Sequence, residues 1–463
     1  MSAITVRMGA CPRWVLPLAL VATPLLVSCG GGGGNGYMAP PAAPTATVSV
    51  APKTITLGQS ATVTWSSTNA TACTASDGWS GAQMTSGTAT VTPTSEGTAS
   101  YTLTCTGSAG SSSGAQSAQL TVNSVYTATV LASDVAGAAT GVIDPNLKNA
   151  WGLVAGPATP FWVANNHKDN STLYDGTGKP LPLIVALPAG FGPTGIVYNG
   201  SKTDFKVNGT SAVFIFAGEG GMLAGWVTGT TAAVTYTAPG PDADRASYKG
   251  LAIAASGGNN FLYATDFHNN KIDTFDTTFA KQALAATAFV DPNLPAGYAP
   301  YGIQALPGGA GGAIQLYVTY SKQDEDAGDG VVGAGLGLVD IYDTTGTLIK
   351  RLISPGGQLN EPWGLALAPD KFGTFSNTLL VGNFGDGTIS VFDASTGDYR
   401  ATLSDSQGKP ITSSGLWALS FGNDQFKQPS TTLFFTAGPN GEDDGVYGRI
   451  DLGATPPVLS LAP

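Results

Sequence analysis

A pattern of three short apolar runs recurs along the chain, and this repeat restricts the fold more than any other feature of the sequence. Its clearest copy lies between Glu361 and Asp393. The apolar runs of this copy are Trp363–Leu367, Leu379–Val381 and Ile389–Phe392, and Gly, Pro, Asn and Asp separate them. Runs of this length between turn-forming residues predict three β-strands joined by turns. One such sheet cannot bury enough apolar surface alone, so we expect the copies to pack against one another.

The pattern occurs six times, and one small residue marks the same place in each copy. These anchor residues are Gly152, Gly195, Gly250, Gly302, Gly364 and Ala418. They lie about 53 residues apart on average, which is close to the repeat length of propeller blades. The sequence therefore predicts an all-β fold in which residues 126–453 form a six-bladed β-propeller. The last copy lacks a fourth strand, and we expect Thr127–Ala132 to supply it by pairing with Val446–Asp451, which would close the ring and remove exposed edges.

The N-terminus has the features of a lipoprotein signal peptide over residues 1–29. Arginines precede an apolar run that ends Leu26-Val-Ser-Cys29,. This ending resembles a bacterial lipobox, which implies that Cys29 is lipidated and becomes the mature N-terminus. Residues 30–44 then form a flexible linker, and Gly30 after the cysteine favours the outer membrane or cell surface. We therefore expect an exported protein that contacts the membrane through its lipid anchor only.

Residues 45–123 have a different pattern, in which Thr and Ser alternate with Val, Ile, Leu, Trp and Tyr in short runs. These runs predict a small β-sandwich, and the segment resembles the immunoglobulin-like modules of exported bacterial proteins. In an oxidising compartment Cys73 and Cys105 would form a disulfide, which stabilises by about 3–4 kcal/mol on the chain-entropy model. Because Trp65 precedes both cysteines, the antibody order Cys-Trp-Cys is absent, and the disulfide need not join the two sheets.

The charge of the chain argues against nucleic acid as a partner. The formal net charge is −11, and the sequence contains no run of Lys and Arg. Such a chain repels phosphate backbones. We expect a monomer whose partner is a small molecule, a glycan or a protein, and a C-terminal tail at 454–463.

Polar residues gather where the second strands of the repeats end. In a propeller, the loops before the first strand and between the second and third strands open on one face, which usually binds. The candidate ligand-binding residues on this face are Asn165, Glu219, Asp266, His268 and Asn383. Acidic residues of the following loops should share it, namely Asp169, Asp324, Glu325, Asp326, Asp329, Asp386, Glu442, Asp443 and Asp444. Glu219, Asp266 and Asn383 offer oxygen ligands, so a metal site for Ca²⁺ is one hypothesis. The alternative is that these residues form turns, in which Asx side chains are common.

His268 stands two residues after Asp266. A histidine beside a carboxylate is a candidate general base. A turn residue is the alternative interpretation, since His268 falls in a polar turn.

The repeats resemble a family of uncharacterised exported bacterial β-propeller proteins, related in pattern to NHL-repeat propellers. The resemblance lies in Ala150-Trp-Gly-Leu153, Ala264-Thr-Asp-Phe-His268, Pro300-Tyr-Gly-Ile303 and Gly445-Val-Tyr-Gly-Arg449. It implies a fold and a compartment, and no activity comes with it. Our first hypothesis is a surface-tethered platform that binds a ligand or a protein. The alternative is a metal-assisted hydrolase or lyase of the gluconolactonase-like propeller type, in which a bound metal would lower the pKa of a water molecule.

Overall fold

A computed structural model describes residues 41–138, 141–240, 245–308 and 312–453. The predicted signal peptide with Cys29, most of the linker and the predicted C-terminal tail lie outside these residues. The described part is all-β apart from the short 3-10 helices η1 (Ser108–Gly110), η2 (Asn166–Lys168) and η4 (Gly373–Phe375). None of the helices in this part has the length and hydropathy that a membrane crossing requires.

Residues 45–123 form two sheets around one apolar core. The first sheet has the order β1 (Thr45–Ala51), β3 (Ala61–Thr68), β6 (Ser86–Val91). The second has the order β2 (Thr54–Thr56), β8 (Ser112–Asn123), β7 (Gly97–Gly107), β4 (Ala70–Asp77), β5 (Gly81–Gln83). Strand β3 buries Val63 and Trp65 and exposes Thr64 between them, because alternate side chains of a strand point to opposite faces. Val63 packs in one core cluster with Leu103 and Leu120 of the second sheet.

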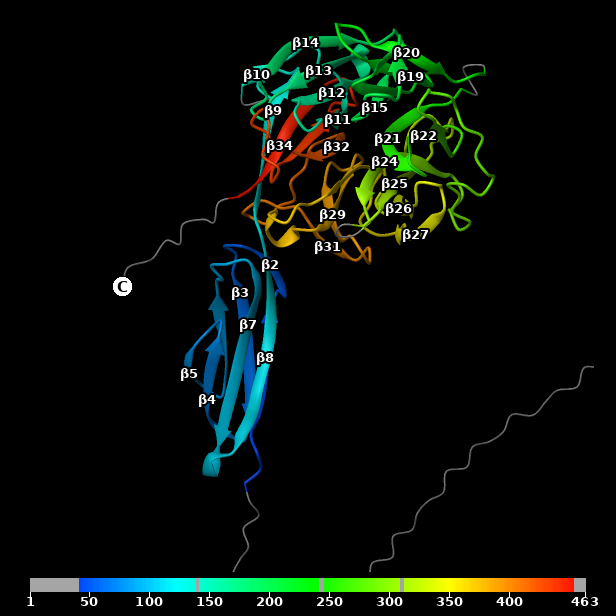
Figure 1. The fold of residues 1–463 in the computed structure, drawn as a ribbon. Helices are drawn as coiled ribbons and strands as arrows, with labels where there is room; N and C mark the ends of the chain where they lie inside the picture. The colour runs from blue at the N-terminus through cyan, green and yellow to red at the C-terminus, as the bar shows by residue number, and fades with distance from the viewer. Residues whose placement is uncertain (1–40, 139–140, 241–244, 309–311, 454–463) are drawn as a thin grey trace, which may run out of the picture. The chain divides into compact units, whose positions relative to one another are not determined.

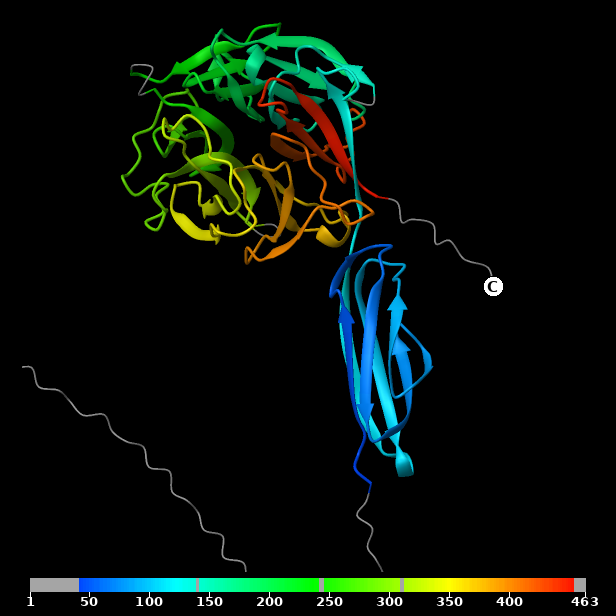
Figure 2. The ribbon, with the colours of Figure 1, turned by 180° about the vertical axis from the view of Figure 1, so that it is seen from behind.

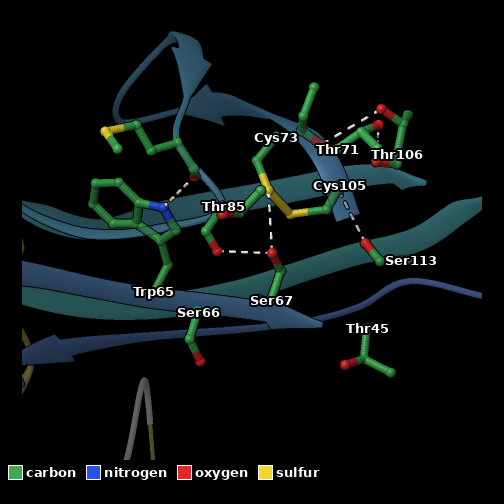
Figure 3. The surroundings of a disulfide bond; sticks show 12 residues. Thr45, Trp65, Ser66, Ser67, Thr71, Cys73, Thr85, Cys105, Thr106 and Ser113 are labelled. Carbon is green, nitrogen blue, oxygen red and sulfur yellow. Dashed lines mark hydrogen bonds between the residues drawn. A yellow bond between two sulfur atoms is a disulfide. The ribbon is translucent and has the colours of Figure 1, made fainter. Parts of the chain in front are cut away.

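Cys73 and Cys105 form the predicted disulfide (Figure 3). Cys73 on β4 lies directly opposite Cys105 on β7 in an antiparallel pair. The bond therefore joins neighbouring strands of one sheet and does not cross the core. Trp65 lies nearby, and its Nε1 donates a hydrogen bond of 2.9 Å to the carbonyl oxygen of Met84 (Figure 3).

Residues 126–452 form six sheets that follow one another around a common centre (Figures 1 and 2). The first is β11 (Ala150–Val154), β12 (Phe161–Asn165), β13 (Asn170–Tyr174), β14 (Pro180–Ala186), and the second is β15 (Pro193–Tyr198), β18 (Phe214–Gly218), β19 (Met222–Trp226), β20 (Ala233–Thr237). The third is β21 (Tyr248–Ser256), β22 (Asn259–Asp266), β23 (Lys271–Phe275), and the fourth is β24 (Tyr298–Pro307), β25 (Ile314–Lys322), β26 (Gly337–Tyr342), β27 (Leu348–Ile353). The fifth is β28 (Pro362–Leu367), β29 (Thr378–Asn383), β30 (Ile389–Asp393), β31 (Tyr399–Thr402). A hairpin of β16 (Lys206–Val207) and β17 (Thr210–Ser211) lies between β15 and β18 in the chain.

The sixth sheet takes strands from both ends of this region. Its order is β10 (Val142–Ile143), β9 (Tyr126–Ser133), β34 (Val446–Leu452), β33 (Leu433–Ala437), β32 (Leu416–Phe421). Strands β9 and β34 pair antiparallel, and Figure 1 shows the cyan strand beside the red one. The expected closure through Thr127–Ala132 is confirmed.

In each sheet one edge strand lies innermost and contacts the innermost strand of the next sheet. The inner strands are β11, β15, β21, β24, β28 and β32, and β32 contacts β11 in turn. A ring of sheets closed in this way is a β-propeller.

The anchor glycines explain why the repeat is visible in the sequence. A Cβ atom on Gly152 would collide with the carbonyl oxygen of Thr194, and one on Gly302 would collide with the carbonyl oxygen of Trp363. Gly195, Gly250 and Gly364 likewise face backbone atoms of the next inner strand. A residue without a side chain is therefore needed where adjacent inner strands approach most closely.

Candidate functional site at the channel mouth

The residue before each anchor lies on an inner strand, and four of these residues bring aromatic rings to the centre. The six residues are Trp151, Thr194, Lys249, Tyr301, Trp363 and Trp417. The rings of Trp151 and Trp417 stack with centroids 3.6 Å apart. Tyr301 and Trp363 each lie 6.0 Å from Trp417, centroid to centroid. These side chains form an aromatic cluster across the central channel.

Lys249 is the one charged residue among these six, and its side chain is only 1% exposed. Its Nζ lies 2.5 Å from Glu219 Oε1 and 2.7 Å from Asp329 Oδ1. The same ammonium lies 5.4 Å from the centroid of the Trp151 ring, within the range of a cation–π contact. Burial lowers the pKa of Lys249, but attraction to Glu219 and Asp329 outweighs burial and raises that pKa above its ordinary value. Lys249 therefore carries its charge inside the protein.

Two more carboxyl groups, those of Glu361 and Glu442, lie close enough to interact electrostatically with this ammonium. Glu361 is 2% exposed, and its Oε1 accepts a hydrogen bond of 3.2 Å from the Tyr301 hydroxyl. Burial raises the pKa of Glu361 to about 7, and repulsion from Asp329 and Glu442 adds to the rise. Burial also raises the pKa of Glu442.

Asparagine side chains connect residues of three of the sheets. The Nε1 of Trp417 donates to Asn149 Oδ1 at 2.8 Å. The Nδ2 of Asn149 donates to Glu442 Oε2 at 2.6 Å and to Asn166 Oδ1 at 3.3 Å. The Nδ2 of Asn166 then donates to Glu219 Oε2 at 2.8 Å. We call this set the mouth network; its members are Asn149, Asn166, Glu219, Lys249, Tyr301, Asp329, Glu361 and Glu442.

Asn149 and Glu361 hold an unusual backbone conformation just before their inner strands. Their φ angles are +43° and +51°, in the left-handed region that costs a non-glycine residue free energy. The residues at the same place in the second and sixth sheets are Gly192 and Gly415, with φ of +53° and +68°. Strained backbone conformations are concentrated at functional sites. A glycine would adopt this conformation without strain, so the presence of a glutamate at position 361 points to a role for its carboxyl group.

Two buried polar atoms near the channel have no hydrogen-bond partner within the described residues. They are Oε2 of Glu361 and Nε1 of Trp151. Leaving a buried polar group unpaired costs about 1–3 kcal/mol. In contrast, the Asp329 side chain is 66% exposed and that of Glu219 is 33% exposed. The network therefore runs from the surface to a buried carboxyl group.

The structure places three of the candidate residues inside the turns of their own sheets. Asn165, Asp266 and Asn383 are each 0% exposed. The Nδ2 of Asn165 donates to Thr172 Oγ1 at 2.9 Å, and the Nδ2 of Asn383 donates to Ser390 Oγ at 3.2 Å. Asp266 Oδ1 accepts from the backbone N–H of Asn269 at 3.2 Å and Oδ2 lies 3.3 Å from Lys271 Nζ. These contacts fit the alternative interpretation of Asx residues as turn formers.

Glu219 joins the mouth network, as do the loop residues Asp329 and Glu442. His268 does not: its Nδ1 lies 3.3 Å from the carbonyl oxygen of Ala327. Across the described ranges, no three acidic, histidine or cysteine side chains gather in a way that could hold a metal ion. The Ca²⁺ hypothesis and the general-base hypothesis stay predictions.

Strand register explains why Glu219 joins the mouth network whereas Asn165, Asp266 and Asn383 do not. Asn165 pairs with Ala150, and Asp266 pairs with Tyr248. In the second sheet the residue at that place is Gly218, and Glu219 comes one position later. Glu219 therefore corresponds to Asn166 and not to Asn165, and Asn166 is the residue that donates a hydrogen bond to it.

Sequence reasoning missed Lys249, Tyr301, Glu361, Asn149 and Asn166. For Lys249 and Tyr301 a signal exists, because each directly precedes an anchor glycine and so lies on an inner strand. For Glu361 the signal is weaker: it stands at the turn before an inner strand, where other copies have glycine.

The sequence is similar to viral proteins of unknown activity. No protein-family model matches it. It is 30% identical over 322 residues to the uncharacterized protein R648 of Acanthamoeba polyphaga mimivirus, which is 66% of this chain and 76% of the relative. It is 28% identical over 321 residues to the uncharacterized protein L690 of the same virus, 66% of this chain and 81% of the relative. The bacterial origin that the sequence suggested stays a prediction.

Solved structures with low sequence identity are also similar. One is virginiamycin B lyase from Staphylococcus aureus, with 13% identity and a TM-score of 0.40, covering 77% of this chain and 92% of that one. Another is an auxiliary nutrient binding protein from Bacteroides ovatus, with 10% identity and a TM-score of 0.40, covering 89% of this chain and 99% of that one. Because R648 is 30% identical and matched over 76% of its length, the chain belongs to the family of the mimivirus uncharacterized protein R648.

Proposed function

We propose that this protein is a binding protein whose ligand site is the mouth network of the propeller. The observation that supports it is the convergence of Glu219, Asp329, Glu361 and Glu442 around Lys249. These carboxyl groups come from different sheets, so the closed ring is what brings them together. Retaining a buried charged group of this kind costs free energy, which a ligand-binding role would explain.

A binding role is favoured over catalysis because the one basic group of the network, Lys249, is already paired with carboxylates. Lys249 is held by two carboxylates and keeps its proton, so it is a poor nucleophile. The metal-assisted hydrolase or lyase remains the alternative hypothesis. It requires side chains that hold a metal ion, for which Glu219, Asp266 and Asn383 are the candidates from the sequence.

Ligand screening by thermal denaturation would test the proposal. We expect a compound from a panel of small cations, anions, neutral polar molecules and glycans to raise the melting temperature. The effect should shrink in a Glu442→Gln variant and remain in Glu325→Gln, whose exposed side chain lies on the same loop as Asp329 but is not a member of the network. A ligand that stabilises both variants and the parent equally would place binding elsewhere.

We propose further that the six sheets are the blades of a six-bladed propeller and that residues 45–123 are an immunoglobulin-like spacer. In this proposal Cys29 is lipidated and holds the protein at the outer membrane or cell surface. The support is the lipobox-like Leu26-Val-Ser-Cys29. A Cys29→Ser variant should leave the membrane fraction, and unchanged membrane partitioning would contradict the anchor.

A further inference from the structure

The mouth network contains more acidic than basic groups. Lys249 supplies one ammonium, whereas Glu219, Asp329, Glu361 and Glu442 supply four carboxyl groups. Carboxylates that share a site repel each other unless a cation or a proton lies between them. An additional positive charge would therefore stabilise this arrangement.

Lys249 shows which kind of cation the site accommodates. Its primary ammonium lies between two carboxylates, at 2.5 Å and 2.7 Å, and over the face of Trp151. An alkylammonium suits such surroundings because its ammonium group donates hydrogen bonds to carboxylates and its methylene groups pack against aromatic rings.

A second position for an ammonium lies at Glu361. Its Oε1 is used by Tyr301, whereas its buried Oε2 has no partner among the described residues. This atom is an acceptor, and an ammonium group is a donor of three hydrogen bonds. The aromatic cluster of Tyr301, Trp363 and Trp417 continues beside it.

We propose that the mouth network binds a ligand bearing a primary alkylammonium group, with Glu361 as its direct partner. The inference rests on the proposed binding function and names the ligand class for it. Asp329 and Glu442 add attraction, since both carboxyl groups interact electrostatically with Glu361. A Ca²⁺ ion is a poorer fit, because it prefers about six to eight oxygen ligands and aromatic rings supply none.

The ligand enters from the face that carries Asp329. Asp329 is exposed, and the next residue, Gly330, lies directly against the Glu361 carboxyl group. A movement of the loop that carries Asp329 and Gly330 would therefore expose the Glu361 carboxyl group.

Isothermal titration calorimetry with n-butylammonium chloride tests the proposal directly. We expect the parent protein to bind n-butylammonium at least tenfold more tightly than 1-butanol, which has a similar shape and no charge. A Glu361→Gln variant should lose at least tenfold in affinity, because the amide keeps an acceptor for Tyr301 but removes the charge. Asp340→Asn is the matched control, since Asp340 is also buried and its pKa is also raised to about 7, but it lies on β26 beside Arg351.

A second variant covers the case in which Glu361→Gln does not fold. Glu361→Gly suits the left-handed backbone at this position and removes the carboxyl group altogether, so it should fold and bind n-butylammonium at least tenfold more weakly. Circular dichroism and tryptophan fluorescence report whether each variant is folded.

Several results would overturn the inference. They are equal binding of 1-butanol, unchanged affinity in the folded Glu361 variants, and binding of Ca²⁺ with none of n-butylammonium. If a neutral or anionic compound binds at the mouth and n-butylammonium does not, the ligand class is wrong and the proposed function stands. If no class of compound binds there, both are wrong.

Discussion

The hydroxyl group of Tyr301 donates a hydrogen bond of 3.2 Å to Glu361 Oε1, and the two side chains are only 1% and 2% exposed. This bond favours the carboxylate form of Glu361, whereas burial and the nearby Asp329 and Glu442 favour the protonated form. Burial and the neighbouring acids prevail, so the pKa of Glu361 rises to about 7. The pKa of Glu361 therefore lies near neutral pH, whereas burial raises the pKa of Tyr301 well above its ordinary value.

The first prediction is a pH dependence of stability that Glu361 causes. A carboxyl group whose pKa is 4.5 in the unfolded chain and about 7 in the folded one binds more protons when folded, so its contribution falls as pH rises between these values. The loss amounts to about 3 kcal/mol for a shift of this size. Urea unfolding at about pH 5 and about pH 8 should show a smaller decrease for Glu361→Gln than for the parent. The exposed Glu325→Gln should behave as the parent does; an equal slope in all three would contradict the prediction.

The second prediction concerns the approach of adjacent inner strands. Gly302→Ala should destabilise the propeller by about 3 kcal/mol, because the new methyl group collides with the Trp363 carbonyl oxygen,. Gly357→Ala is the control, since a Cβ there meets no atom within 4 Å and its φ is not left-handed. Chemical denaturation measures the free energy of unfolding of both variants. A similar small loss of stability in both would show that the inner strands can move apart at little cost in free energy.

The third prediction concerns the disulfide. Replacing Cys73 and Cys105 together by alanine should destabilise the two-sheet module by about 2–5 kcal/mol. The propeller has its own core clusters, so its unfolding transition should not move. Scanning calorimetry of the parent and the double variant would resolve the two transitions. A shift of the propeller transition would show that the module supports the ring.

The fourth prediction concerns closure of the ring through β9. A chain that begins after Ala132 should aggregate, because β34 loses its antiparallel partner and becomes an exposed edge,. A chain that begins at Ser124 keeps β9 and serves as the control. Size-exclusion chromatography separates the outcomes, and a monomeric shorter chain that melts like the control would mean that β9 is dispensable.

The architecture was predictable because its constraint is local and repeated. Each anchor glycine is needed where two inner strands meet, so the same small residue returns at the same place in the pattern. The closing strand could be found for a similar reason: Thr127–Ala132 was an apolar run without a partner, and the last repeat lacked a strand.

The site was less predictable because it depends on register and on contacts between distant sheets. Asn165 and Glu219 look equivalent in sequence, yet Asn165 is the last residue of its strand, whereas Glu219 follows the end of its strand and joins the mouth network. Glu361 precedes a strand in a turn, and nothing near it in the sequence shows that Tyr301 and Asp329 will surround it. Residues of different sheets become neighbours only when the ring closes, so local sequence patterns do not predict these contacts.

The pairing of β9 with β34 also sets a time scale for biosynthesis. The two strands are separated by about 300 residues, which take about 15–60 s to translate at about 5–20 residues per second. For that period the edge of Tyr126–Ser133 that will pair with β34 has no partner within the nascent chain, since β10 pairs only at the other edge, and other chains can add to the open edge. A folding assistant that protects the growing polypeptide therefore has to shield this one segment until the final strand has left the ribosome.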